Sequence, residues 1–430
     1  MRVYKPSGIK WLGEIPQSWE IKKLKYIGEI FGGVTGKTIK DFSKEYKLNF
    51  KPYITFTNVC NNAVINPDLM EYVFIDSKEK QNKVLKNDIL FLQSSETFED
   101  VGKSAIYLND DEVYLNTFCK GFRIEREAYP MYLNYLLSSL SYKRYFMSVC
   151  SGFTRINLRQ EHFLDIPLIL PPLQEQKEIA EFLDSKCEKI QNYIEKKQKL
   201  ITLLQEKKQA LINEAVTKGL NPNIEFKPSG IEWLGEIPQS WEIKKCKFFF
   251  IIQNTIVGDL WNKTKLLSLT LNGVVERDIN NPEGKFPSDF STYQLVKRGN
   301  LVFCLFDVEE TPRAIGLSQI DGMITSAYTV IKVVNQNERF LAYLFISLDN
   351  GKNLSFLYRG LRKTISKEDL LNLKIPLPPL QEQKEIAAFL DSKVAQIDSV
   401  IEKTKKQIEL VKEYKNTLIN EAVCGRIRVN

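Results

Sequence analysis

The chain has 430 residues, a length typical of two or three domains. Its 60 lysines and arginines against 53 aspartates and glutamates give a net charge of +7, which allows a polyanionic partner without requiring one. His162 is the only histidine, which excludes histidine-rich metal sites and disfavours a histidine-dependent enzyme. The seven cysteines are scattered without a C-x-x-C pair, and no signal peptide or 20-residue apolar run occurs, so we expect a cytoplasmic protein.

A tryptophan-containing segment near the N-terminus occurs twice. Residues 5–25 read KPSGIKWLGEIPQSWEIKKLK and residues 227–247 read KPSGIEWLGEIPQSWEIKKCK, with 19 of 21 positions identical at an offset of 222. We call each segment a box. Its glycines and proline predict turns around Trp11 and Trp19. Two interpretations stay open: the box anchors its surroundings by packing aromatic rings, or it docks another subunit.

A stretch of variable length follows each box, and we call these stretches the inserts. The first insert, 26–170, has 145 residues and the second, 248–377, has 130. Apolar runs separated by asparagine and glycine predict mixed α/β structure in both. The expected strands are 53–59, 89–92, 105–108, 301–306 and 328–334, and the expected helices are 131–146 and 340–347.

Short sequence matches indicate that the inserts share a fold. KNDILF at 86–91 parallels RGNLVF at 298–303. Ile156-Asn157 is matched to Ile365-Ser366 shortly before the next repeated segment. The inserts therefore differ mainly on their surfaces.

Patterns that would indicate catalysis in this chain are incomplete. The run GGVTGKT at 32–38 is one residue short of a phosphate-binding loop, so a flexible loop with exposed Lys37 and Thr38 is expected instead. Asp68, Asp76 and Lys78 only faintly resemble a metal-dependent nuclease. The methyltransferase motif N-P-P-[FY] and a glycine-rich loop for S-adenosylmethionine do not occur in the sequence. We therefore predict no catalytic residues and no metal site.

Each insert is followed by a second repeated segment. PPLQEQKEIAEFLDSK at 171–186 and PPLQEQKEIAAFLDSK at 378–393 match at 15 of 16 positions, at an offset of 207. LINEAV recurs at Leu211 and Leu418 with the same offset. Two prolines followed by roughly 43 strong helix formers predict helices on the order of 65 Å long.

Apolar residues in both predicted helices follow a 3-4 spacing typical of a coiled coil. We expect the two helices to pair antiparallel, although each could instead pack on its own domain. The polar seam positions could fix the register or face solvent or a partner. The seam positions are Ala180, Leu183, Cys187, Ile190, Ile194, Lys197, Ile201, Leu204, Lys208, Leu211 and Ala215, and Ala387, Leu390, Val394, Ile397, Ile401, Thr404, Ile408, Val411, Lys415, Leu418 and Ala422.

Variable inserts between repeated boxes and PPLQEQ helices closely resemble the specificity subunit of type I restriction-modification systems. The resemblance covers essentially the whole chain and is carried by PPLQEQ at 171–176 and 378–383 and by GEIP at 13–16 and 235–238. It implies a pseudo-twofold tandem repeat of two mixed α+β target-recognition domains joined by two long antiparallel coiled-coil helices. The expected division is 1–170 for the first target-recognition domain, 171–219 for the first spacer helix, 220–377 for a linker and the second target-recognition domain, and 378–430 for the second spacer helix and tail.

The resemblance also implies a function. Each insert would read one half of an asymmetric, bipartite site in double-stranded DNA, and the helices would set the spacing and dock two modification (methyltransferase) subunits. Restriction subunits would join, and S-adenosylmethionine, ATP and Mg would be bound by these partners, with no cofactor in this chain. The alternatives are a scaffold that reads a target other than DNA, and an enzyme with a nuclease site hidden in an insert.

Candidate DNA contacts are polar residues in loop-like segments beside the predicted strands. Lysine and arginine would bind phosphates, and other side chains would reach base edges. The candidates in the first insert are Lys37, Thr38, Thr154, Arg155, Asn157 and Arg159, and those in the second are Arg277, Arg313, Arg359, Arg362 and Lys363.

Overall fold

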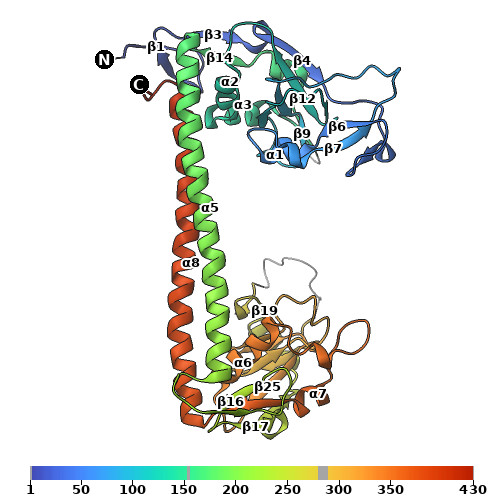
Figure 1. Cartoon of the computed structure of the whole chain (residues 1–430), viewed down its shortest axis with the longest axis vertical. Coiled ribbons are helices and arrows are strands. Elements are labelled where there is room, and N and C mark those ends of the chain that lie inside the picture. Colours follow the sequence, from blue (N-terminus) through green and yellow to red (C-terminus); the bar gives the residue numbers. More distant parts are fainter. Residues whose placement is uncertain (1, 153–154, 279–288, 430) are drawn as a thin grey trace. The chain divides into compact units, whose positions relative to one another are not determined.

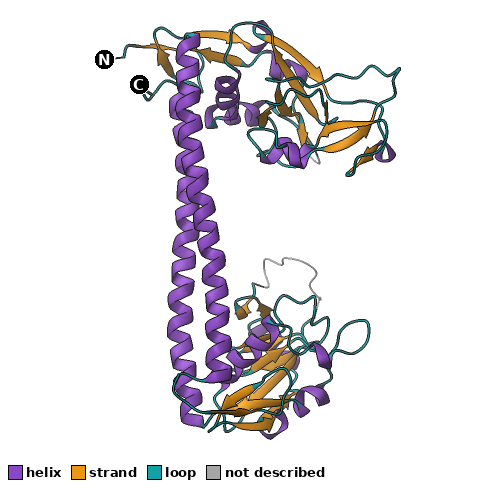
Figure 2. Cartoon of the chain, viewed as in Figure 1, coloured by secondary structure: helices purple, strands orange, loops and turns teal. Residues whose placement is uncertain are grey.

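Contacts in the computed structural model divide the chain into two compact units. One unit combines Met1–Lys197 with Lys406–Asn430, and the other is Gln198–Lys405. Each unit contains one box, one insert and parts of both long helices, and strands and short helices alternate within each insert (Figure 2), which confirms the mixed α/β prediction. The structure describes residues 2–152, 155–278 and 289–429.

The two long helices are α5 (Leu173–Lys218, 46 residues) and α8 (Leu380–Val423, 44 residues). Both begin two residues after the first proline of the PPLQEQ segment. Proline lacks a backbone N–H and clashes with the preceding turn, so it does not fit inside a helix. Gly219 and Gly425, just past the two C-terminal ends, have φ angles of +76° and +71°. Glycine adopts this left-handed conformation without a steric penalty, which closes each helix.

Within each unit, the start of one long helix packs against the end of the other (Figure 1). Leu183 of α5 and Ala422 of α8 share the core of the first unit, whereas Leu390 of α8 and Val216 of α5 share the core of the second. The predicted antiparallel pairing is therefore confirmed. All the predicted seam positions are buried or half-buried.

Two polar seam positions, Lys208 and Thr404, form hydrogen bonds within the paired helices. Lys208 of α5 donates to Asp398 of α8 over 2.6 Å. Thr404 is buried, and its hydroxyl donates to the Val400 carbonyl one turn earlier, at 2.7 Å. The Lys208 ion pair favours the interpretation that this position helps to fix the register.

Each box ties the two ends of its insert together. Strand β3 (Glu20–Lys23) pairs antiparallel with β14 (Pro167–Leu170), at the end of the first insert. Strand β17 (Glu242–Lys245) pairs in the same register with β26 (Lys374–Leu377), at the end of the second. The remaining strands of the boxes are β1 (Tyr4–Pro6), β2 (Glu14–Pro16), β15 (Phe226–Pro228) and β16 (Glu236–Pro238).

The second tryptophan of each box is fully buried and joined to the nearby PPLQEQ segment. The indole nitrogen of Trp19 donates to Glu175, and that of Trp241 donates to Glu382, both at 3.0 Å. Buried indole N–H groups usually need such a partner. These contacts support the anchoring interpretation of the box and explain why the tryptophan and the glutamate recur together.

Both inserts contain the same four-stranded antiparallel sheet. Its strand order is β10-β8-β12-β4 in the first insert and, in the reverse listing, β18-β25-β22-β23 in the second. The bounds are β4 (Gly28–Gly32), β8 (Ile89–Leu92), β10 (Ser104–Ile106), β12 (Cys119–Ile124), β18 (Phe250–Gln253), β22 (Leu301–Phe303), β23 (Ile315–Leu317) and β25 (Thr329–Val333).

The match between KNDILF and RGNLVF reflects the same turn before the matching strands β8 and β22. The Asp88 carboxylate accepts the Leu85 N–H at 2.8 Å, and the Asn300 side chain accepts the Lys297 N–H at the same distance. Asn87 and Gly299, one residue earlier, both have positive φ angles. The shared fold that these residues predict is confirmed.

Other parts of the inserts differ from each other and from prediction. The expected strand 53–59 is only partly a strand, because Thr55 caps the helix α1 and accepts the Asn58 N–H. The expected helix 131–146 is broken at Ser139, whose backbone is extended. The elements are β5 (Phe42–Ser43), β6 (Phe50–Ile54), α1 (Phe56–Asn61), β7 (Glu71–Phe74), β9 (Ser94–Ser95), β11 (Tyr114–Leu115), α2 (Pro130–Ser138), α3 (Leu140–Val149), β13 (Ile156–Asn157) and α4 (Gln160–Leu164), then β19 (Leu267–Thr270), β20 (Gly273–Glu276), β21 (Gln294–Val296), β24 (Gly322–Ile324), α6 (Glu338–Asn350) and α7 (Lys367–Asn372).

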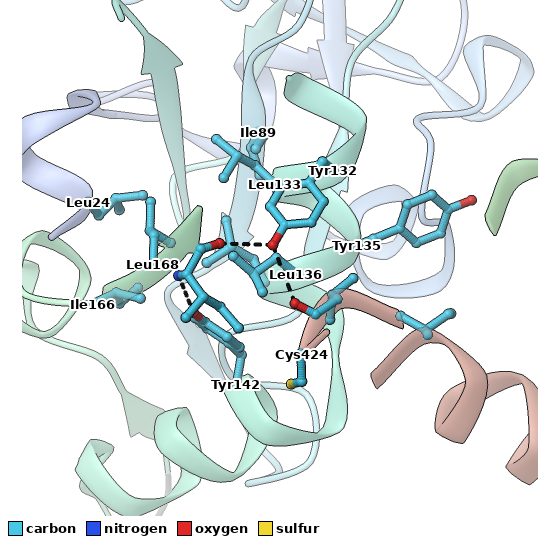
Figure 3. Close-up of a cluster of buried hydrophobic side chains, with 14 of the residues drawn as sticks. Leu24, Ile89, Tyr132, Leu133, Tyr135, Leu136, Tyr142, Ile166, Leu168 and Cys424 are labelled. Atoms are coloured by element: carbon cyan, nitrogen blue, oxygen red, sulfur yellow. Dashed lines mark hydrogen bonds between the residues drawn. The ribbon is translucent and has the colours of Figure 1, made fainter. Parts of the chain in front are cut away.

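The end of α8 completes the core of the first unit (Figure 3). The Tyr132 hydroxyl lies 2.8 Å from the Ile169 carbonyl of β14 and 3.3 Å from the Val423 carbonyl of α8. Asn420 of α8 also accepts the buried N–H of Ser141, at 2.9 Å. The core of the first insert therefore depends on residues far along the chain.

The long helices carry charged residues along their whole length, which disfavours their insertion into a membrane. Of the helices that the structure describes, none combines the length and the apolar character needed to cross a bilayer.

Candidate nucleic-acid interface

Two described candidates in the first insert, Arg155 and Asn157, lie on a short hairpin closed by Ser151 and Asn157, which precedes α5. Ser151 pairs with Asn157, and β13 of the same hairpin pairs with β9. The exposed Arg155 guanidinium lies over the Phe118 ring, 4.4 Å from its centroid. Arg159, just before α4, is also exposed and lies 3.5 Å from Glu161. The candidate Thr154 lies outside the described residues.

Three candidates in the second insert lie on the corresponding hairpin before α8. Arg359 pairs with Thr364 through backbone hydrogen bonds at 2.9 and 3.0 Å. Arg359 and Arg362 are exposed to 71% and 67%, so both can reach a partner. Lys363, the next residue, lies 3.5 Å from Glu309.

The second hairpin holds Arg362 between an acid and a ring. Its Nε donates to Asp307 at 3.1 Å, and its guanidinium lies 5.4 Å from the centroid of Phe306. The Phe306 ring in turn stacks on Tyr328 at 6.0 Å. Hydrogen bonding to Arg362 holds the pKa of Asp307 below its usual value, so this carboxylate is ionised at neutral pH.

From Asn157 and Thr364 onward, the two hairpins correspond at an offset of 207, the same offset as the long helices. Their pairing partners Ser151 and Arg359 are 208 residues apart, so the first hairpin is one residue longer. The Leu158 N–H donates to the Gln93 carbonyl after β8, and the Ile365 N–H donates to the Leu305 carbonyl after β22, both at 2.9 Å. The predicted match of Ile156-Asn157 with Ile365-Ser366 is therefore wrong by two residues. It aligned two isoleucines that do not occupy equivalent positions. Leu158 matches Ile365.

Arg155 and Arg362 occupy the same position in this register, three residues before Leu158 and Ile365. Both guanidinium groups lie over a phenylalanine ring. The ring comes from a different place in each insert, since Phe118 precedes β12 and Phe306 follows β22.

The candidates Lys37 and Thr38 are engaged within the protein. The Lys37 side chain is only 6% exposed and forms an ion pair with Glu79, so the expected exposure of this lysine is wrong. Thr38 caps a single 3-10 turn by hydrogen bonding with Asp41 at 2.7 and 2.9 Å. Their segment precedes β5 and is separate in sequence from the first hairpin.

The remaining candidates, Arg277 and Arg313, lie apart from the second hairpin in sequence. Arg313 is 16% exposed, donates to Asn350 at 2.8 Å and lies 3.6 Å from Asp349. Arg277 follows β20, is half-buried, and its backbone N–H donates to the Leu266 carbonyl at 2.8 Å. Neither residue belongs to the matched hairpins.

The structure adds features that the sequence reasoning missed. The rings Phe118 and Phe306 lie under the matched arginines but carry no motif. A groove of about 1250 Å³ in the second unit is lined by α5, α8 and the second insert, with Arg298, Arg313 and Lys208 among its residues. Its lining comes from several separate segments, so no local sequence signal marks it.

Comparison with known proteins gives a consistent family. The model of the type I restriction modification DNA specificity domain matches residues 16–205 and 323–410. The MjaVIII type I restriction enzyme specificity subunit of Methanocaldococcus jannaschii is 30% identical over 451 residues, covering 100% of this chain and 98% of that protein. The EcoKI specificity subunit of Escherichia coli K12 is 24% identical, covering 96% and 90%.

Solved structures share the fold. A chain from a study of complex assembly and conformational transition in the type I R-M system aligns with a TM-score of 0.69 and 14% identity, covering 96% of this chain and 99% of that chain. The HsdS subunit from Thermoanaerobacter tengcongensis aligns with a TM-score of 0.51 and 16% identity, covering 96% and 98%.

Proposed function

This chain belongs to the family of the type I restriction modification DNA specificity domain, and we propose that it is the DNA sequence-recognition subunit of a type I restriction-modification complex. Each insert reads one half of an asymmetric, bipartite site in double-stranded DNA. The observation that carries this proposal is the pair of inserts that share a sheet but differ in surface, each held by the same box and helix contacts.

The proposed DNA contacts fall into two kinds. Lysines and arginines bind phosphates and supply affinity without sequence information, whereas other polar side chains reach base edges. The two matched hairpins are the best supported positions because their arginines are exposed beside sheet ends. Lys37 would have to leave Glu79 before it could bind a phosphate.

The paired helices have two proposed roles. Two equivalent sets of helix and box surfaces offer two equivalent docking sites, which suits two copies of one modification subunit. The antiparallel pairing, with a cross-helix ion pair between Lys208 and Asp398, gives a spacer between the two reading inserts.

The chemistry in this proposal belongs to the partner subunits. The chain directs adenine methylation and restriction without catalysing either. Modification subunits would bind S-adenosylmethionine, and restriction subunits would bind ATP and Mg. The incomplete catalytic motifs of the sequence support this division.

The experiment that tests the function compares methylated adenines in cells that express the modification subunits with and without this chain. We expect one bipartite motif to be methylated only when the chain is present. A genome without any chain-dependent motif would contradict the proposal. A lack of salt-dependent binding to duplex DNA would favour a scaffold for another target. Mg-dependent cleavage by the purified chain would favour a hidden nuclease.

A further inference from the structure

The two hairpins before the long helices hold one arginine each at the same position. Arg155 and Arg362 are related by the 207-residue offset of the helices, and their hairpins are fixed to matching strands by the same hydrogen bond. By contrast, Arg159 matches Ser366 at this offset. Arg359 pairs with Thr364 as Ser151 pairs with Asn157, so the counterpart of Arg359 is a serine. The shared arginines are therefore set within an otherwise divergent surface.

Each arginine is oriented by an aromatic ring. The Arg155 guanidinium lies 4.4 Å from the centroid of Phe118, and the Arg362 guanidinium lies 5.4 Å from that of Phe306. A guanidinium can stack on a ring by its face while its N–H groups at the edge remain able to bind an oxyanion bidentately. Both side chains are exposed, so this edge is accessible.

A residue that is the same in both inserts cannot distinguish two different half-sites. Apart from the adenine that is methylated, the feature that two different half-sites share is the sugar-phosphate backbone. We propose that Arg155 and Arg362 each bind a backbone phosphate of their half-site, as a matched, sequence-independent pair that fixes the register of each insert on the duplex. This inference rests on the proposed function as a DNA-reading subunit.

The two arginines differ in whether an acidic side chain lies next to them, and this difference adds a second test of the proposal. Asp307 accepts hydrogen bonds from Arg362, whereas Arg155 has no acidic partner within the part of the chain that the structure describes. An exposed ion pair contributes little to stability. A phosphate can therefore displace Asp307 from the Arg362 guanidinium, or bind the guanidinium beside it. The arginine of the second hairpin must nevertheless give up part of this contact, and Asp307→Asn should therefore tighten DNA binding.

The test uses the complex of this chain with its modification subunits. The affinity is measured across salt concentrations for a duplex with the methylated motif and for a scrambled duplex. We expect Arg155→Ala and Arg362→Ala each to lower the slope of log K against log salt by about 0.9, and the double variant to lower it by about 1.8. Both duplexes should be weakened by the same factor, and the methylated motif should not change.

Matched controls separate this outcome from general damage. Arg155→Lys and Arg362→Lys keep the charge and should keep the slope, whereas Arg159→Ala and Arg359→Ala remove exposed arginines that have no arginine counterpart. Assembly with the modification subunits, followed by size-exclusion chromatography, shows whether each variant folds. A relaxed base at one position of the motif would identify a base-reading residue and overturn the proposal.

An unchanged slope in the assembled alanine variants would also overturn the proposal, because it would show that no phosphate contact was lost. If the unaltered complex did not prefer its motif over the scrambled duplex, the proposed function itself would fail. The two failures are therefore distinguishable.

Discussion

The two inserts keep one sheet but differ in what is attached to it. In the first insert, a second four-stranded sheet, β11-β6-β7-β5, accompanies the common one. In the second insert, the corresponding region contains two separate two-stranded sheets, β19-β20 and β21-β24. Side chains of α2 and α3 pack against the common sheet in the first insert, and side chains of α6 do so in the second. Variation has thus been confined to additions around a fixed sheet.

Strand pairing locates the 15-residue difference in length. The offset between matching residues is 222 at Ile30 and Ile252, 212 at Ile89 and Leu301, and 207 at the hairpins. Most of the difference therefore lies between the first and second strands of the common sheet. This stretch also contains most of the strands that differ, namely β5, β6 and β7 in the first insert and β19, β20 and β21 in the second.

The strongest way to test the independence of the inserts is to exchange one of them. Replacing residues 248–377 with the second insert of another family member should change one half of the methylated motif completely and leave the other half unchanged. The reason is that each insert is closed by its own box strand, β3 or β17. Sequencing of methylated adenines in cells measures the result. Changes in both halves would show that the inserts do not read independently.

The next largest effect concerns the distance between the two half-sites. Adding one heptad to both α5 and α8 keeps the antiparallel seam and lengthens each helix by about 10 Å. We expect the gap in the motif to grow by about three base pairs, at about 3.4 Å per step, while both half-sites stay the same. Motif sequencing measures the gap. A variant that folds but keeps the original gap would exclude the helices as the spacer.

The buried tryptophans test whether the two boxes are equivalent anchors. Trp19→Ala and Trp241→Ala should each destabilise their own unit by about 3–5 kcal/mol, because each removes a fully buried ring and leaves a glutamate without its indole donor. Amide hydrogen exchange resolves the two units. The half-buried Trp11 provides a milder control, since Trp11→Ala leaves the hydrogen bond to Glu175 in place. Loss of protection in both units equally would contradict local anchoring.

The smallest effect concerns an ion pair present in one unit. Lys208 pairs with Asp398 at 2.6 Å, and the same antiparallel register places Lys415 opposite Gln191 in the first unit. Lys208→Ala should therefore cost about 0.5 kcal/mol, and Gln191→Asp should stabilise the first unit by a similar amount. Urea unfolding at low and high salt measures both changes. A gain from Gln191→Asp that persists at high salt would show that its origin is not the ion pair.

The sequence predicts repeated features better than local ones. The long helices, their antiparallel pairing and the shared fold follow from near-identical segments and a heptad seam, since each pattern is sampled many times. The residues around Thr55 favour a strand, so the sequence does not predict the helix α1, which the Thr55 side chain caps. The partners of Lys37 and Arg362, Glu79 and Asp307, are distant in sequence, so no spacing rule could reveal which candidate cations are engaged.

The part of α8 in the core of the first unit has a consequence for synthesis on the ribosome. The second unit is one continuous segment, Gln198–Lys405, and can close as soon as that segment has emerged. The first unit waits for Asn420 and Val423, which bond to Ser141 and Tyr132. Closing it means joining ends separated by about two hundred residues, a step that costs entropy and comes last. A nascent chain therefore finishes its second reading insert before its first, and an interrupted chain leaves the first one open.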